Sequence, residues 1–97
     1  MTFFDNYDFD LLKNEAEKLI LNELEIQLAA EQEICKCNDC VVDMAAIALN
    51  SVRPMYRYSL LGSLYTEYAV SDQSYVESVH KAVTQAIAKV KKNPSHD

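Results

Sequence analysis

The chain has 97 residues and a formal net charge of −6, and it contains one glycine, two prolines and no tryptophan. This length suits one domain with a modest core, which we take to span residues 1–97, and the scarcity of turn residues excludes a sheet-rich fold. No apolar run approaches the roughly 20 residues of a membrane span, and no signal sequence precedes a cleavage site. We therefore expect an all-α protein of the cytoplasm with no membrane partner.

Negative charge is concentrated in residues 1–33, which carry nine acidic residues and two lysines. The rest of the chain is close to neutral. General nucleic-acid binding requires a broad basic face that displaces counterions from phosphates. The sequence has no such face, which argues against duplex DNA or long RNA as a direct partner.

The first predicted element is one long helix running roughly from Asp8 to Glu31. Its apolar residues recur mostly at spacings of three and four, as in an amphipathic helix. At about 1.5 Å per residue, such a helix would be about 36 Å long, more than the rest of a small domain can cover. The apolar stripe is also broad, with Leu21 flanking its main face. A second copy of the chain would cover this surface, so we expect a homodimer.

The next feature is a cysteine knuckle, formed by Cys35, Cys37 and Cys40. Three thiols this close are poor disulfide formers, but as thiolates they suit a single zinc ion. A helix beginning near Cys40 would also direct amide N–H groups at the sulfur atoms. We therefore predict that these cysteines bind zinc. The alternative is that they are three reduced cysteines at a helix entrance.

The run of cysteines does not supply a fourth zinc ligand. The candidates are His80, Asp43, Asp39, a group from a partner chain or a water molecule, and carboxylates are less favoured beside three thiolates. A bound water would leave room for a zinc hydrolase. That interpretation ranks low, because compact knuckles are generally structural and no general base lies nearby in sequence.

Two further helices are predicted after the knuckle. A short, almost wholly apolar helix from Val41 to about Asn50 belongs in the core. A last helix, capped by Ser71 or Asp72, carries a one-sided apolar stripe and ends in lysines that suit a helix C-terminus. The stripe consists of Val76, Val79, Val83, Ala86, Ile87 and Val90.

An irregular segment between these two helices concentrates tyrosine and arginine. It contains Arg53, Tyr56, Arg57, Tyr58, Ser59, Gly62, Tyr65 and Tyr68. Tyrosine rings stack on bases, guanidinium groups bind phosphate oxygens in pairs, and a glycine allows the backbone to approach a ligand closely. These residue types are typical of a small nucleotide site. Alternatively, the rings are buried in the core or in a dimer contact, and the arginines keep the edge soluble.

Several short motifs together resemble a known family in their order and spacing. They are Asn6-Tyr7, Cys35-Lys36-Cys37-Asn38-Asp39-Cys40, Asp43, Ala48-Leu49-Asn50, Pro54-Met55-Tyr56 and Ser59-Leu60-Leu61-Gly62. This succession is similar to the late competence protein ComFB family over about residues 6 to 68. The family commonly has two prolines after the asparagine, whereas this chain has Arg53-Pro54.

The resemblance implies a small helical homodimer in bacteria, a metal knuckle, and binding of a cyclic dinucleotide such as c-di-GMP or c-di-AMP. On that basis Arg53 and Arg57 would face the phosphates, and Tyr56 and Tyr58 would stack on the bases. The remaining expected roles are phosphate or ribose contacts at Ser59 and Gly62 and orientation of the turn by Asn50.

Three function classes follow. The first is a non-enzymatic signalling module that binds a cyclic dinucleotide and acts on an unidentified regulatory protein partner. The second is an interaction or scaffold protein of DNA uptake or motility, with the acidic first helix as its contact face. The third is the zinc hydrolase.

Overall fold

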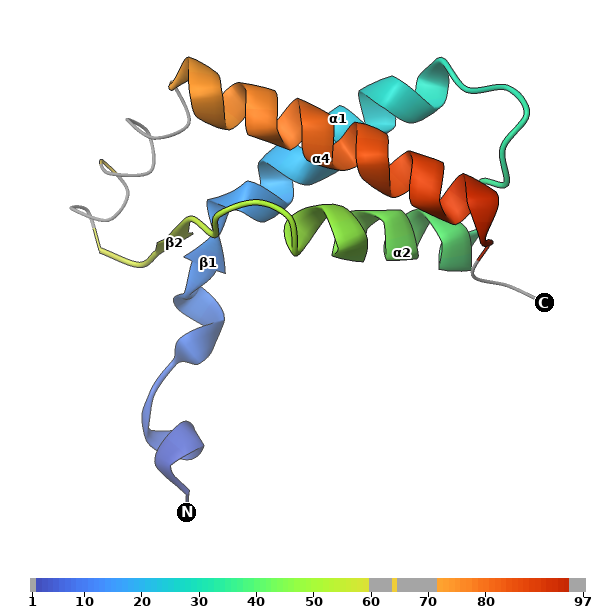
Figure 1. Ribbon diagram of the computed structural model, residues 1–97. Coiled ribbons are helices and arrows are strands. Elements are labelled where there is room, and N and C mark those ends of the chain that lie inside the picture. Colours follow the sequence, from blue (N-terminus) through green and yellow to red (C-terminus); the bar gives the residue numbers. More distant parts are fainter. Residues whose placement is uncertain (1, 60–63, 65–71, 95–97) are drawn as a thin grey trace.

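The computed structural model describes residues 2–59, 64 and 72–94. Three helices dominate this part of the chain, namely α1 (Glu15–Ala29), α2 (Asn38–Leu49) and α4 (Gln73–Lys92). Each contacts the other two, and α4 lies across both α1 and α2 (Figure 1). The predicted helical domain is therefore confirmed.

The core lies where the three helices meet. Ile20 of α1, Met44 of α2 and Val83 of α4 are each fully buried, and Cys40 joins them at the start of α2. Apart from Met55, which precedes β2, the other buried positions follow the helical spacing of their elements, so that each helix turns one stripe inward. They are Ala16, Leu24, Leu28, Ala48, Met55, Tyr75, Val79, Ala82, Ala86, Ile87 and Val90.

The predicted N-terminal helix is present, but it is shorter than the expected range of Asp8 to Glu31. Two short 3-10 turns, η1 (Phe3–Asn6) and η2 (Phe9–Leu11), come first, and α1 has only 15 residues. At about 1.5 Å per residue α1 is roughly 22 Å long. The helix begins after Asn14, whose side chain accepts a hydrogen bond from the backbone N–H of Ala16 (3.2 Å) and caps α1 there.

A two-stranded ribbon, absent from the sequence prediction, fixes the start of α1. Strand β1 (Lys13–Asn14) pairs antiparallel with β2 (Tyr56–Arg57), with Lys13 opposite Arg57. The Asn14 side chain also accepts from the backbone N–H of Met55 (2.7 Å), and the Glu15 N–H donates to the Met55 carbonyl (2.7 Å). These bonds tie the segment after α2 to the first turn of α1.

The two predicted later helices are present. Helix α4 begins where expected, because the Asp72 carboxylate accepts from the backbone N–H of Ser74 (3.0 Å) as an N-cap. Its buried stripe contains every predicted residue except Val76, which is 47% exposed, and also includes Tyr75 and Ala82. No helix in the described part of the chain is long and apolar enough to cross a membrane.

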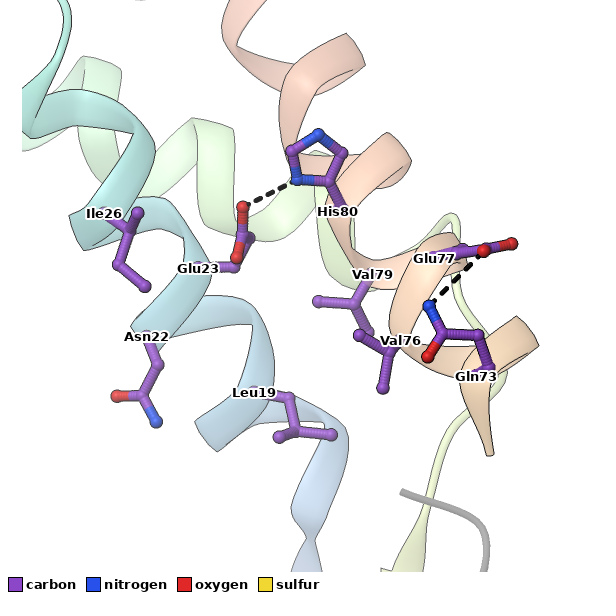
Figure 2. A pocket seen from close by; sticks show the side chains of 9 residues that line it. All are labelled: Leu19, Asn22, Glu23, Ile26, Gln73, Val76, Glu77, Val79 and His80. Atoms are coloured by element: carbon purple, nitrogen blue, oxygen red, sulfur yellow. Dashed lines mark hydrogen bonds and ion pairs between the residues drawn. The ribbon is translucent and has the colours of Figure 1, made fainter. Parts of the chain in front are cut away.

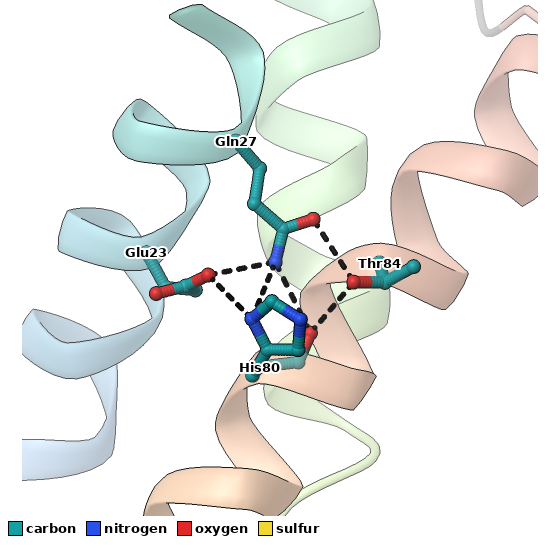
Figure 3. A network of polar contacts seen from close by, with 4 residues as sticks. All are labelled: Glu23, Gln27, His80 and Thr84. Atoms are coloured by element: carbon teal, nitrogen blue, oxygen red, sulfur yellow. Dashed lines mark hydrogen bonds and ion pairs between the residues drawn. The ribbon is translucent and has the colours of Figure 1, made fainter. Parts of the chain in front are cut away.

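A polar network joins α1 to α4 at the edge of the core (Figure 3). The Glu23 carboxylate lies 2.9 Å from His80 Nδ1 and accepts from the Gln27 amide at 2.7 Å. Gln27 also donates to the His80 carbonyl (3.2 Å) and accepts from the Thr84 hydroxyl (3.0 Å). These polar contacts hold α1 and α4 in register at the edge of their apolar contact.

Candidate functional site

The three cysteines converge at the N-terminus of α2. Their sulfur atoms all lie within 4.8 Å of one another, Cys40 is buried, and Cys35 and Cys37 are partly buried. Cys37 is the N-cap of α2, and its Sγ accepts from the Cys40 backbone N–H at 3.4 Å. An N–H donor and the positive end of the helix dipole both favour a thiolate at this position.

This cluster fits a zinc ion in donor type and nearly in geometry. A zinc–sulfur bond of about 2.3 Å in a tetrahedral site places sulfur atoms about 3.8 Å apart. The observed separations, all within 4.8 Å, require inward movements of an ångström or less. Cys35, Cys37 and Cys40 are the residues that would hold the ion, and no other metal-binding group of three or more such side chains occurs among the described residues.

His80 does not lie with the cysteines. Its ring contacts Glu23 near the middle of the α1–α4 seam, whereas Cys35 and Cys40 share a small cavity with Val90 of α4. Ten residues separate His80 from Val90, which corresponds to about 15 Å along a helix. The structure therefore offers no support for His80 as the fourth ligand. Glu33, which sequence reasoning overlooked, lines the same cavity as Cys35 and Cys40.

The predicted nucleotide residues lie at the other end of α2, on the ribbon and the segment leading to it. Arg57 is about half buried there and forms an ion pair with the Glu15 carboxylate through Nε. Across the ribbon, Lys13 is directly opposite Arg57 and is exposed. Cross-strand neighbours share one face of a ribbon, so Lys13 adds a second cation that the sequence analysis did not assign.

Arg53 is held by a different element. Its guanidinium carbon lies 5.6 Å from the ring centroid of Tyr75, and its carbonyl accepts a hydrogen bond from the Tyr75 hydroxyl (2.9 Å). Burial raises the pKa of the Tyr75 phenol above its ordinary value, and the positive charge of Arg53 offsets part of that rise. The two arginines therefore anchor the segment to α4 and α1 respectively.

The two tyrosines expected to stack are open to solvent. Tyr56 is 60% exposed and Tyr58 is 67% exposed, which excludes the alternative that these two rings are buried in the core of the single chain. Asn50 is the C-cap of α2, and exposed Ser59 ends the described part of this segment. The expected role of Gly62 falls outside the described residues, as do Tyr65 and Tyr68.

Two apolar grooves flank α1. The α1/α4 groove has a volume of about 450 Å³ and is bordered by Glu23, Glu77 and His80 (Figure 2). The α1/α2 groove, on another side of α1, measures about 320 Å³ and includes Leu21 and Val42. Neither groove was predicted from the sequence.

The fold and the candidate site define a small helical domain with a cysteine knuckle at one end of its central helix and a tyrosine–arginine ribbon at the other. The family model for the late competence development protein ComFB matches residues 13–94. This match covers most of the chain, so the chain belongs to the ComFB family.

A solved structure agrees with this assignment. The structure of the late competence protein ComFB from Bacillus subtilis superposes on this chain with a TM-score of 0.70 at 25% sequence identity. The alignment covers 87% of this chain and 92% of that one. No curated protein matches this chain significantly.

Proposed function

We propose that the chain is a non-enzymatic signalling module of the cytoplasm that binds a cyclic dinucleotide, c-di-GMP or c-di-AMP, as a homodimer. The observation that supports this proposal best is the ribbon, where Tyr56 and Tyr58 expose their rings on either side of Arg57 in the chain, and Lys13 lies opposite. Exposed aromatic faces and guanidinium groups are the usual means of holding bases and phosphates.

A symmetric dimer suits a symmetric ligand. A cyclic dinucleotide has two bases and two phosphates related by a two-fold axis, and two copies of one chain supply two copies of every contact. In this arrangement Arg57 and Arg53 face the phosphates, while the Tyr56 and Tyr58 rings stack on the bases. Asn50, Ser59 and Gly62 keep their expected supporting roles.

Binding requires the arginines to exchange partners. Arg57 is paired with Glu15, and Arg53 lies over Tyr75. A phosphate offers each guanidinium two charge-assisted hydrogen bonds in place of these contacts. Release of Glu15 or of Tyr75 on binding would then pass ligand occupancy to α1 or to α4, and from there to a regulatory protein partner.

Zinc at the knuckle completes the proposal. Cys35, Cys37 and Cys40 would hold one structural Zn²⁺ and join the turn before α2 to the first turn of that helix. Asp39, Asp43, a partner-chain group or water remain the proposed fourth ligands. In this role the metal stabilises the helices on which the ribbon is mounted and takes no part in a reaction.

Titration calorimetry with c-di-GMP and c-di-AMP at physiological salt tests the proposal. We expect heat from at least one ligand, and Arg57→Ala to weaken its affinity at least about tenfold, because a charged hydrogen bond contributes roughly 1.5–3 kcal/mol. Lys81→Ala, which removes the same charge from an exposed site on α4, is the matched control and should bind normally. If neither ligand gives heat at about 100 µM, the scaffold function replaces the receptor function.

The scaffold alternative has its own support. Residues 2–12 expose aromatic and acidic side chains away from the helices, as a protein contact face would. Under this alternative the chain is a non-enzymatic interaction module of DNA uptake or motility.

A further inference from the structure

The first eleven described residues project from the domain as an arm with an aromatic cluster. The rings of Phe3, Phe4, Tyr7 and Phe9 contact one another with centroids 4.9–6.1 Å apart, yet these side chains remain 47–74% exposed. Neither η1 nor η2 contains a buried residue. The arm leads away from the three helices (Figure 1). It also precedes the region matched by the family model, which begins at residue 13.

The arm combines its apolar rings with negative charge. Asp5, Asp8 and Asp10 give it three carboxylates and no cation. A preformed aromatic cluster of this size is rarely left in water, so a complementary surface is expected. That surface must offer both an apolar groove and positive charge.

Charge selects one groove of the molecule. The α1/α2 groove exposes Leu21 and Val42, which are 45% and 57% exposed, and it continues past Leu21 and Glu17 into a second concavity. The border of this concavity carries three cations and two carboxylates, which are Lys13, Lys18, Arg57, Glu15 and Glu17. Within the described part of the chain, neither lysine has an ion-pair partner. Apolar surface is therefore continuous here with a surface on which cations outnumber carboxylates.

The other concavities fit less well. The α1/α4 groove is bordered by the carboxylates of Glu23 and Glu77, which would repel an acidic arm. Lys91, near the end of α4, adjoins a cavity of only about 60 Å³. That volume is well below the roughly 150 Å³ cavity known to hold one benzene ring. The α1/α2 groove, at about 320 Å³, is large enough for aromatic side chains.

We propose that this arm docks in the α1/α2 groove of a second copy of the chain, so that two copies exchange arms. The arm does not easily reach the α1/α2 groove of its own chain. Lys13 is paired in β1, Asn14 caps α1, and no glycine or proline lies between Phe9 and Asn14 to reverse the chain. Lys13 and Lys18, which border the groove's extension, lie close to the point where the arm leaves the domain. A two-fold axis near β1 would therefore place the arm of each copy along the groove of the other copy.

This inference rests on the homodimer of the proposed function but assigns its contact surface. It can be tested with a photo-crosslinking phenylalanine analogue, p-benzoylphenylalanine, in place of Phe9 of an unlabelled chain. That chain is mixed with an excess of ¹⁵N-labelled chain that has the natural residue. The two are allowed to exchange subunits, irradiated and digested, and the crosslinked peptides are identified by mass spectrometry.

We expect the analogue to capture ¹⁵N-labelled peptides from α1 around Leu21 and from α2 around Val42. Val42→Asp should abolish this capture and weaken self-association at least about tenfold. Ile26→Asp is the matched control, because Ile26 is a 65% exposed apolar residue of the other groove, and it should change neither result.

Labelled peptides from elsewhere, unlabelled peptides of the arm's own chain, or no crosslink would each overturn arm exchange. Self-association of the full chain is measured in parallel by light scattering. A dimer that gives no labelled groove peptide would refute the arm contact and leave the dimer of the proposed function intact. Ligand heat in calorimetry tests the proposed function separately, because heat without labelled groove peptides would refute the arm contact alone.

Discussion

The two ends of α2 differ in how their functional side chains are held. At the N-terminus, three cysteine sulfur atoms converge within 4.8 Å around space that one soft cation would fill. At the other end, the arginines are already paired within the chain, Arg57 with Glu15 and Arg53 with Tyr75. The cysteine end is thus preorganised for a ligand, whereas the ribbon must first give up internal contacts.

Under the proposed function, the cysteine end is a structural site and the ribbon is a responsive one. A preorganised cluster gains its binding energy with little rearrangement, so that energy adds directly to folding. A site that exchanges partners binds more weakly, but each released partner can report that the ligand is present. We therefore expect metal removal to change stability and ligand binding to change the contacts of α1 and α4.

The largest expected effect is at the cysteine end. Cys37→Ser should remove the zinc and lower the free energy of unfolding by at least about 2 kcal/mol, or roughly 8–16 °C in melting temperature. Serine is itself a good N-cap, so the substitution isolates the loss of the sulfur ligand from the loss of the cap. Metal analysis and thermal unfolding, with and without chelator, provide the measurement.

Ser51→Ala is the matched control, because it removes an exposed hydroxyl that donates to the Ile47 carbonyl at the far end of α2. It should keep one zinc per chain and stay sensitive to chelator. A Cys37→Ser protein that retained a full equivalent of zinc would contradict the assignment of the knuckle. Wild-type protein prepared without chelator that held well under half an equivalent would do the same.

A smaller effect is expected at the ribbon, where a substitution should increase ligand affinity. Glu15→Gln should release Arg57 from its ion pair and tighten cyclic dinucleotide binding about three- to tenfold, because less internal contact is lost on binding. Stability should fall by no more than about 1 kcal/mol, since the pair is partly open to solvent.

Glu17→Gln makes the same charge change two residues later on α1, at an exposed side chain with no ion pair in the described part of the chain. It should leave the affinity within about twofold of the wild-type value, as expected for loss of a screened surface charge. Calorimetry on both variants decides the question. Equal affinities for the two variants would mean that Arg57 does not exchange Glu15 for the ligand.

Much of this architecture follows from short-range signals in the sequence. The apolar stripe of α4, its Asp72 cap and the entry of α2 at the cysteines were all predicted, because spacing and capping chemistry act over a few residues. The sulfur cluster was predictable for the same reason. Its three ligands lie within six residues, so almost any turn brings them together.

The errors arose where distant residues meet. The apolar pattern before residue 15 suggested a helix, but Asn14 caps α1 and bonds to Met55, 41 residues later. That contact creates the ribbon and delays the start of the helix to Glu15, and neither can be read from local spacing. The pairing of Arg57 with Glu15 is equally non-local. The dimer argument that used helix length is therefore replaced by one that uses the exposed arm.

The smallest expected effect concerns the anchor of Arg53. Tyr75→Phe removes the hydrogen bond from its hydroxyl to the Arg53 carbonyl and should cost about 0.5–1.5 kcal/mol of unfolding free energy at neutral pH. Because burial raises the pKa of Tyr75 in the folded state, the neutral phenol stabilises the fold. This contribution is complete below the unfolded pKa of about 10 and is lost as the pH rises through the higher folded value.

The gap in stability between wild type and Tyr75→Phe should therefore narrow above about pH 10, as measured by denaturant unfolding at a series of pH values. Tyr58→Phe serves as the control, because its ring is 67% exposed and it should follow the wild-type profile throughout. A gap that stayed constant into alkaline solution would show that the phenol of Tyr75 does not support the Arg53 anchor. The ribbon would then depend on Asn14 and Glu15 alone for its attachment to the helices.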